Sequence, residues 1–480
     1  MHNRTVGVSP GPGLLAGLIV GATVAPAIGQ LGLDQSRTSF VDRQRILQRE
    51  NEDRQHRDIP LTQKLSVDYG GWFNTYFFLY DDGVDSSRTL RQYELRVWAS
   101  VTADRGIHTG YARMRTTYLD WNKGDQVTAH EDDLDGPNLE RGWYQFDVAR
   151  ALRIYGEKDI PFELRTKIGR DLVNVGTGYA ISLPLDHVEI VGEWYDFETR
   201  FLVGRTPSSV ENIDSSRSVA DHSDRDFWVI EEKYKGFENH EPFVYVAWQN
   251  DHTREDPLDL LQNYQYDSAY VGFGSTGELI DNLRYSSEWV IERGESYGDQ
   301  RYLYTNDIKA WAFDQRLDYY FRHKTKPVVS AEYMFASGDP KRAGSPTNAE
   351  GGLVGDNVDN GFVGFGFRDT GIAFAPQLSN IHIWRLGGSL RPLPDYDATK
   401  DLEIGTDYYL YWKNKKAAAV SDGLADEQSG YLGWEMDYYA NYRILSDLSW
   451  TVRFGTFFPG SAFSDRSVRT FLLTGITWSF

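Results

Sequence analysis

Long segments with a period of two constrain the fold of this chain more than any other feature. In the segment 90–102, Leu95 and Val97 fall on one face while Glu94 and Arg96 fall on the other. The same alternation is found in the segments 400–413 and 448–458. Alternation of this kind predicts β-strands with one apolar face. These segments run about 10–13 residues, longer than the usual ~5–6 of globular strands and close to a tilted membrane-spanning strand.

The order of strands and connectors predicts a barrel. Seventeen strands are expected near 68–80, 90–102, 108–120, 139–149, 161–170, 197–205, 226–235, 242–250, 266–275, 283–293, 305–322, 328–337, 380–391, 400–413, 430–443, 448–458 and 467–480. A short strand at His187–Val191, followed by a turn at Gly192–Tyr195, brings the total to about 18, and bacterial barrels need an even number. We therefore expect an all-β fold, a transmembrane antiparallel β-barrel with short periplasmic turns and long extracellular loops.

The connectors alternate in length as this fold requires. Short connectors are expected at Ala103–Ile107, His323–Pro327, Pro392–Lys400 and Leu445–Asp447. Long polar connectors are expected at Trp121–Asn138, Asp171–Asp186, Thr206–Arg225, Asp251–Gln265, Gly338–Leu378 and Asn414–Ser429. The longest loop, 338–378, then lies outside the cell, and the sequence leaves open whether it gates a pore.

The two ends of the chain indicate export and membrane insertion. Arg4, the apolar stretch Leu14–Val24 and the small-x-small segment Ala25–Ala27 are typical of a signal peptide over residues 1–29. A flexible or core-forming N-terminus is the alternative. Residues 30–64 are charged and form a polar periplasmic lead-in, so the barrel is expected over 65–480. The last strand ends at the aromatic Phe480, which resembles the signal read by the barrel-insertion machinery, although an ordinary edge strand could end in the same way.

Composition alone suggests a soluble protein, with 40% apolar residues and a mean hydropathy of −0.52. A barrel whose strands face water on one side gives the same averages. The absence of Cys excludes a disulfide scaffold and zinc–cysteine or iron–sulfur sites. The net charge of −20 argues against nucleic-acid binding, and no cofactor is expected. We expect localisation in a Gram-negative outer membrane, as a multi-pass barrel in contact with its lipids.

The polar face of the strands carries the candidate pore residues. A basic side chain facing lipid near mid-membrane costs about 2–4 kcal/mol, so parity assigns the charged residues to the lumen. The basic candidates are Arg96, Arg113, Arg115, Arg165, Lys167, Arg200, Arg316, Arg385 and Arg453. Such a wall would attract an anionic polymer. Alternatively, these residues pair with acids on neighbouring strands and only brace the wall.

Several short motifs together resemble the alginate export family of outer-membrane proteins. They are Lys167–Asp171 followed by Gly176–Gly178, Ala310–Phe313, Ala336–Asp339, Ser379–His382, Leu386–Gly387, Leu432–Asp437 and Phe457–Gly460. The resemblance implies a monomeric 18-stranded barrel with an Arg-lined constriction that exports alginate or a similar polyuronate. It also implies that Arg170 lies in the pore or at its rim. Asp171 replaces the family's usual Gln, which puts alginate itself in doubt as the substrate.

Four functions fit the sequence to different degrees. The favoured one is passive export of an anionic exopolysaccharide, fed by a periplasmic export apparatus. A general or anion-selective small-solute porin is the alternative. An enzyme is not expected, because the ten His are scattered and no G-x-S-x-G segment occurs. A soluble sugar-binding β protein is the fourth, and extraction without detergent would identify it. The acidic loop 131–135 could bind calcium, but a solvated loop is the better interpretation.

Overall fold

The computed structural model describes residues 65–480 except 84–86, 126–131, 157–159, 211, 216–221, 253–264, 298–304, 343, 350–351, 354 and 356. The predicted signal peptide 1–29 and lead-in 30–64 lie outside the described residues. Within the described part, eighteen long strands follow one another along the chain. The first nine are β1 Leu65–Asp81, β2 Arg88–Ala103, β3 His108–Trp121, β4 Asp133–Asp147, β5 Phe162–Val175, β6 Ile181–Trp194, β7 Phe197–Arg205, β8 Arg225–Tyr234 and β9 His240–Asp251. The others are β10 Asp267–Ile280, β11 Leu283–Ser296, β12 Asn306–Tyr320, β13 Val328–Ala336, β15 Ile381–Leu390, β16 Glu403–Lys413, β17 Tyr431–Arg443, β18 Leu448–Pro459 and β19 Arg469–Ser479.

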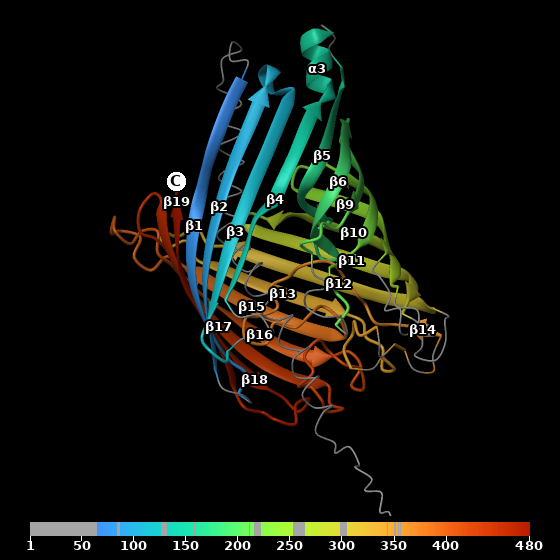
Figure 1. Cartoon of the computed structure of the whole chain (residues 1–480), viewed down its shortest axis with the longest axis vertical. Coiled ribbons are helices and arrows are strands. Elements are labelled where there is room, and N and C mark those ends of the chain that lie inside the picture. The colour runs from blue at the N-terminus through green and yellow to red at the C-terminus, as the bar shows by residue number, and fades with distance from the viewer. Residues whose placement is uncertain are drawn as a thin grey trace, which may run out of the picture.

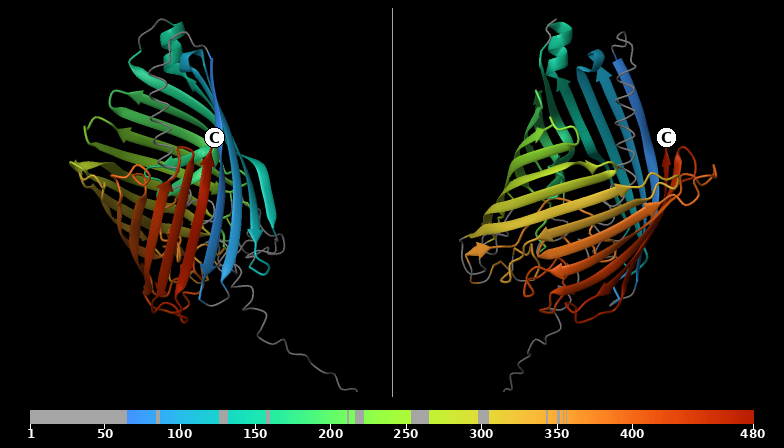
Figure 2. Two further views of the ribbon diagram at one scale, coloured as in Figure 1. Left: turned by 90° about the vertical axis from the view of Figure 1, so that its left-hand side faces the viewer. Right: turned by 180° about the vertical axis from the view of Figure 1, so that it is seen from behind.

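These strands close into a single barrel (Figure 1). Each long strand pairs antiparallel with the next, with β13 pairing β15. The barrel closes where β19 pairs with β1, from Trp72 opposite Ser479 to Asp81 opposite Thr470. Figure 2 shows β19 beside β1 at this seam. The predicted antiparallel barrel of about 18 strands is therefore confirmed, and closure leaves the paired strands without a sheet edge.

The connectors are short at one end of the barrel and mostly long at the other. At the first end lie the 3₁₀ turn η2 (Asp104–Gly106) and the connectors 321–327, 391–402 and 444–447, as predicted. At the other end, the loop 337–380 joins β13 to β15 and contains the two-residue strand β14, Val358–Asp359, which pairs in parallel with β12.

One predicted loop, Asp171–Asp186, is wrong. β5 continues to Val175 and β6 begins at Ile181, so only a tight turn over 176–180 separates them. The apolar alternation continues through this region, and two glycines, Gly176 and Gly178, take positive φ values of 58° and 82° to make the turn. The predicted short strand His187–Val191 is accordingly part of a strand that reaches Trp194.

A helix that was not expected from the sequence, α3 (Val148–Tyr155), lies between β4 and β5 at the short-turn end (Figure 1). Asp147 begins it as an N-cap residue, because its carboxylate accepts a hydrogen bond of 2.8 Å from the Arg150 backbone N–H. The helix occupies the end of the barrel that was expected to carry only turns.

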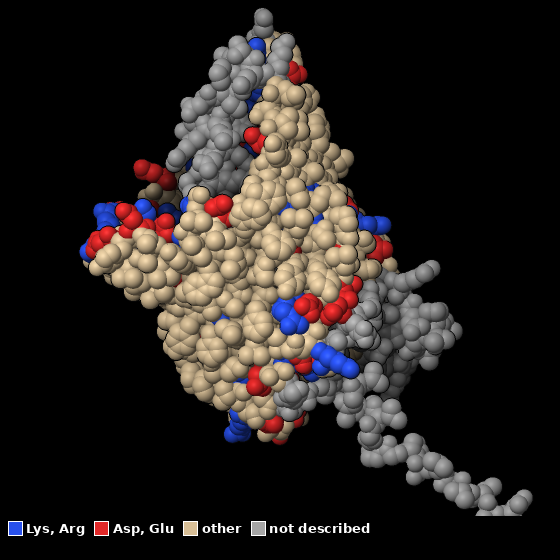
Figure 3. Space-filling model, turned by 60° about the vertical axis from the view of Figure 1, so that its left-hand side comes forward, with Lys and Arg blue, Asp and Glu red and all other residues tan. Residues whose placement is uncertain are grey.

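The outer face of the barrel is apolar. Val188, Phe201 and Ile230 expose 48%, 48% and 42% of their surface on neighbouring strands, and exposure of this kind on a barrel marks the lipid-facing side. In the space-filling view, charged side chains are sparse over much of the face and gather in patches toward its margins (Figure 3). The strand face that the sequence predicted to be apolar therefore points outward.

No helix in the described residues is both long enough and apolar enough to cross a membrane.

Candidate functional site

The inner face of the wall carries nine of the ten predicted basic residues. In β2, Leu95 and Val97 are exposed outward, so the alternating position Arg96 points inward and is buried. The same parity argument applies to the other strands, because each predicted residue alternates with exposed or lipid-facing apolar neighbours. The residues placed inward are Arg96, Arg113, Arg115, Arg165, Lys167, Arg200, Arg316, Arg385 and Arg453.

Arg170 does not lie on this inner face. In the register of β5 and β6, Ile168 faces Val188 and Arg170 faces Asp186, and both pairs share the outward side. The Arg170 guanidinium forms two hydrogen bonds with the Asp186 carboxylate, of 2.7 Å and 2.8 Å. The family resemblance implied that Arg170 lies in the pore or at its rim; the structure places its side chain on the outward side, so it does not line the inner wall. A paired carboxylate lets the residue sit at the end of the lipid-facing surface.

Two inward arginines of neighbouring strands share one buried carboxylate. Glu140 lies in a β-bulge of β4 and accepts hydrogen bonds from Arg96 Nε at 3.0 Å and from Arg113 Nε at 2.7 Å. Arg96 also pairs with Glu94 on its own strand. The side chains of Arg96, Arg113 and Glu140 each expose less than 10% of their surface. This group, Arg96, Arg113 and Glu140, braces the wall rather than presenting free positive charge.

Other inward cations are paired but more accessible. Arg165 lies 2.7 Å from Glu193, and the two side chains are 41% and 31% exposed. Arg316 lies 2.8 Å from Asp318, with 40% of its side chain exposed. Arg115, Lys167 and Arg200 form the ion pairs Arg115–Asp135, Lys167–Asp171, Lys167–Glu189, Arg200–Glu189 and Arg200–Glu231.

The loop 337–380 reaches the inner wall and joins its charges. Arg385 of β15 contacts Glu332 at 3.2 Å, Asp407 at 2.9 Å and the loop residue Asp369 at 3.5 Å. The adjacent loop residue Arg368 lies 2.8 Å from Asp314 of β12. We call these six residues the loop–wall cluster. It ties the loop to β12, β13, β15 and β16 through alternating charges.

Carboxylates of the wall also hold the backbone of this loop. Glu435 of β17 accepts hydrogen bonds from the backbone N–H groups of Ile372, Ala373 and Phe374, at 2.6, 2.7 and 2.9 Å. Glu292 of β11 accepts one from Val363 at 3.0 Å. Three backbone donors converging on one carboxylate fix the loop in a single inward arrangement.

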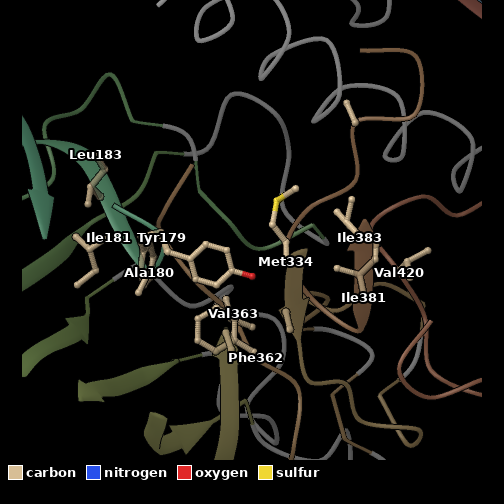
Figure 4. Packing of buried hydrophobic residues seen from close by; sticks show 14 of the residues in the cluster. Tyr179, Ala180, Ile181, Leu183, Met334, Phe362, Val363, Ile381, Ile383 and Val420 are labelled. Carbon is tan, nitrogen blue, oxygen red and sulfur yellow. The ribbon is translucent and has the colours of Figure 1, made fainter. Parts of the chain in front are cut away.

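The loop packs against the turn 176–180 inside the barrel. Phe365 donates a backbone hydrogen bond to Ala180 at 2.7 Å, and Tyr179 Oη donates one to the Phe335 carbonyl at 2.9 Å. Figure 4 shows the Tyr179 ring directed toward Met334, with Phe362 beside it. Burial raises the pKa of Tyr179 well above its ordinary value, so its hydroxyl remains a donor. The sequence indicated a long loop here but not that it packs inside the barrel.

The described residues contain no group of three or more His, Cys, Asp or Glu side chains that could hold a metal ion. Of the acidic loop 131–135, Asp132 accepts a hydrogen bond from the Trp121 backbone and Asp135 pairs with Arg115, while residue 131 lies outside the described part. Asp132 and Asp135 therefore serve local contacts, and residues 133–135 belong to the strand β4 and not to a loop as predicted.

Comparison with known proteins identifies what this barrel is similar to. A family model described as alginate export matches residues 210–471. Comparison with curated protein sequences gives no significant match. Solved structures with a similar fold include the Pseudomonas aeruginosa proteins OccK11 (OpdR), at 13% identity and a TM-score of 0.51, and the outer membrane protein OpdK, at 12% identity and a TM-score of 0.52. Both alignments cover 86% of this chain, with 96% of OccK11 and 99% of OpdK.

These likenesses fix the location and the general role. The protein is an outer-membrane β-barrel of the multi-pass kind, and its fold and family are those of transport porins rather than of enzymes. The match to the family model also covers the segments Ala336–Asp339 and Leu432–Asp437 by which the sequence resembled that family.

Proposed function

The chain belongs to the alginate export family, and on that premise we propose that it exports an anionic exopolysaccharide, alginate or a similar polyuronate, by passive passage along its inner wall. The observation that carries this proposal is the set of inward guanidinium groups that remain accessible. Arg165 and Arg316 expose 41% and 40% of their side chains, and each is already paired with a carboxylate.

Exchange of carboxylates explains how such a wall could pass a polyuronate. An exposed ion pair is worth only about 0–1 kcal/mol, so a carboxylate of the polymer can replace Glu193 at Arg165 at little cost. The planar guanidinium fork binds either carboxylate in the same geometry. Arg96 and Arg113 keep a different role, because their shared partner Glu140 is buried with them.

Export from the periplasm to the outside determines which partners the protein needs. A passive outer-membrane pore needs a periplasmic export apparatus to feed the polymer. The last strand, β19, is followed directly by the aromatic Phe480, and we propose that the barrel-insertion machinery reads this segment. We also propose that the barrel works as a monomer, as the family resemblance implies.

Planar-bilayer recordings of the purified protein test the proposal. We expect anion-selective conductance that falls toward non-selective when Arg165 and Arg316 are both replaced by Gln. Arg170→Gln serves as the matched control, because that arginine is paired on the outward face. Cation-selective conductance of the wild type, or selectivity that the double replacement leaves unchanged, would contradict the proposal.

One observation favours the alternative of a small-solute porin. Residues of the loop 337–380 pack in the barrel interior, and a loop there narrows the space that is open to a polymer. Deleting the gene and measuring polymer outside the cell separates the two functions, because a small-solute porin leaves export normal.

A further inference from the structure

Three aromatic side chains form a row on the inner wall near the short-turn end of the barrel. Trp98 of β2, Tyr111 of β3 and Trp143 of β4 lie on adjacent strands, with Tyr111 directly opposite Trp143 in the register. The ring centroids are 6.2 Å apart between Trp98 and Tyr111 and 5.7 Å apart between Tyr111 and Trp143. The interplanar angles are 21° and 23°, so the three rings are stacked along the row.

The parity of the strands directs this aromatic row into the lumen. Val97 and Tyr144, the neighbours of Trp98 and Trp143, are 44% and 43% exposed on the outer face. The three rings of the row are each partly exposed. An aromatic girdle at a membrane interface would lie on the other parity, together with Tyr144. The row therefore has no role in contacting lipid.

Cations border the aromatic row on both sides. Lys167 Nζ lies 5.8 Å from the centroid of the Trp143 ring. At the other end, Arg113 faces Trp98 in the register of β2 and β3 and lies over the ring of Trp72, 5.5 Å from its centroid. Three neighbouring ring faces are thus bordered by a basic side chain at each end, and each of these side chains also pairs with a carboxylate of the wall.

The glycine at position 70 leaves the space that the Trp98 ring occupies. A Cβ atom on Gly70 would come within 3.2 Å and 3.3 Å of two atoms of the Trp98 indole, and within 2.8 Å of the Phe480 carbonyl oxygen. The glycine lets the indole lie against β1 at the seam of the barrel. The row is therefore supported by the neighbouring strand on its β1 side.

This combination fits one class of ligand. The faces of a pyranose ring carry C–H groups that pack on aromatic rings, and a uronate residue adds a carboxylate that Lys167 can pair with. We propose that the aromatic row is a binding subsite for the uronate residues of the polymer, at the periplasmic mouth. It rests on the proposed export function and adds to it a contact that recognises the sugar ring and not only its charge.

Single-channel block in planar bilayers tests the subsite. The probe is a defined oligouronate, added on the short-turn side to wild type and to the double variant Trp98→Leu/Trp143→Leu. We expect the double variant to be blocked about tenfold more weakly, equivalent to ~1.4 kcal/mol. The control is Trp289→Leu/Trp311→Leu, a stacked outward pair with a centroid distance of 5.7 Å, which should leave block unchanged. Tyr111→Leu serves as a second variant should the double variant fail to fold.

A second probe separates ring recognition from charge. An oligoacrylate of the same charge has no pyranose ring, so its block should be equal in wild type and in the double variant. Equal block of both proteins by the oligouronate would overturn the subsite and leave the export proposal standing. If the double variant is blocked more weakly by both probes to the same extent, the subsite is also overturned, because the aromatic row would then only position the cations. If the oligouronate does not block wild type at all, both proposals fail.

Discussion

At the scale of single residues, shared carboxylates determine which arginines of the inner wall can meet a substrate. Glu140 holds Arg96 and Arg113 where all three side chains are buried. Glu140→Gln removes the charge from this group and leaves two buried guanidinium groups with one acceptor fewer. We expect a loss of about 3–5 kcal/mol in the free energy of unfolding. Denaturant unfolding of the purified barrel, followed by the electrophoretic mobility of the folded form, measures it.

The control for this prediction is an exposed pair at the short-turn end. Asp281 lies 3.2 Å from Arg322, with side chains 89% and 74% exposed. Asp281→Asn should change the unfolding free energy by less than about 1 kcal/mol. Equal stability of Glu140→Gln and Asp281→Asn would contradict the bracing role of Glu140.

Which side chains face inward could be predicted from the sequence, and how they are paired could not. Parity follows from the period of the strand, so a local pattern places Arg165 and Arg316 correctly. Pairing depends on the register and on bulges such as the one at Glu140, which no local pattern encodes. Arg170 shows the limit of family resemblance, because the motif matched while the face that the residue occupies did not follow from it.

At the scale of elements, the loop 337–380 depends on a few carboxylates of the wall. Glu435→Ala removes the acceptor of three loop N–H groups, and buried donors without a partner are costly. We expect the loop to leave its site, with larger conductance and new protease cleavage within 337–380. Asp395→Asn, in an exposed pair with Lys324 at the short-turn end, should change neither. Unaltered conductance and cleavage in Glu435→Ala would contradict the anchoring role.

The same loop predicts a response to pH. Burial raises the pKa of Asp369, but the Arg385 and Arg453 guanidinium groups lower it by more, so the pKa lies below its ordinary value. A lowered pKa in the folded state means that the stabilisation is present above about pH 4 and is lost as the pH falls through the lowered pKa. Protease cleavage of the loop should therefore stay constant between about pH 8 and pH 5. As the pH falls further, cleavage should rise less in Asp369→Asn than in wild type, because the variant has no carboxylate at this position to protonate. Increased cleavage of wild type already near pH 6 would contradict this.

Strands were predicted better than their connections. The strands with clear alternation were found, while the region 171–186 was taken for a loop because its polar residues and glycines masked a continuing apolar face. The helix α3 was missed because its eight residues follow a strand directly and are too few for a clear helical period. The inward path of the loop 337–380 depends on contacts with strands far away in the sequence, and no local pattern indicates such contacts.

At the scale of the whole molecule, closure of the barrel explains a polar composition in a membrane protein. One side of each strand meets lipid and the other meets the interior, so a mean hydropathy of −0.52 is compatible with eighteen membrane strands. The net charge of −20 is likewise no obstacle to anion transport. What an anion meets is the local arrangement of accessible pairs such as Arg165–Glu193.

The most direct test of polymer export is efflux from reconstituted lipid vesicles. Vesicles carrying the protein are loaded with a labelled oligouronate or with a neutral oligosaccharide of equal length, and the release of each is timed. Passage along accessible guanidinium groups predicts that the oligouronate leaves faster, and that replacing Arg165 and Arg316 by Gln removes most of the difference. Retention of both oligosaccharides while monosaccharides escape, or equal rates for the charged and neutral chains, would contradict the account.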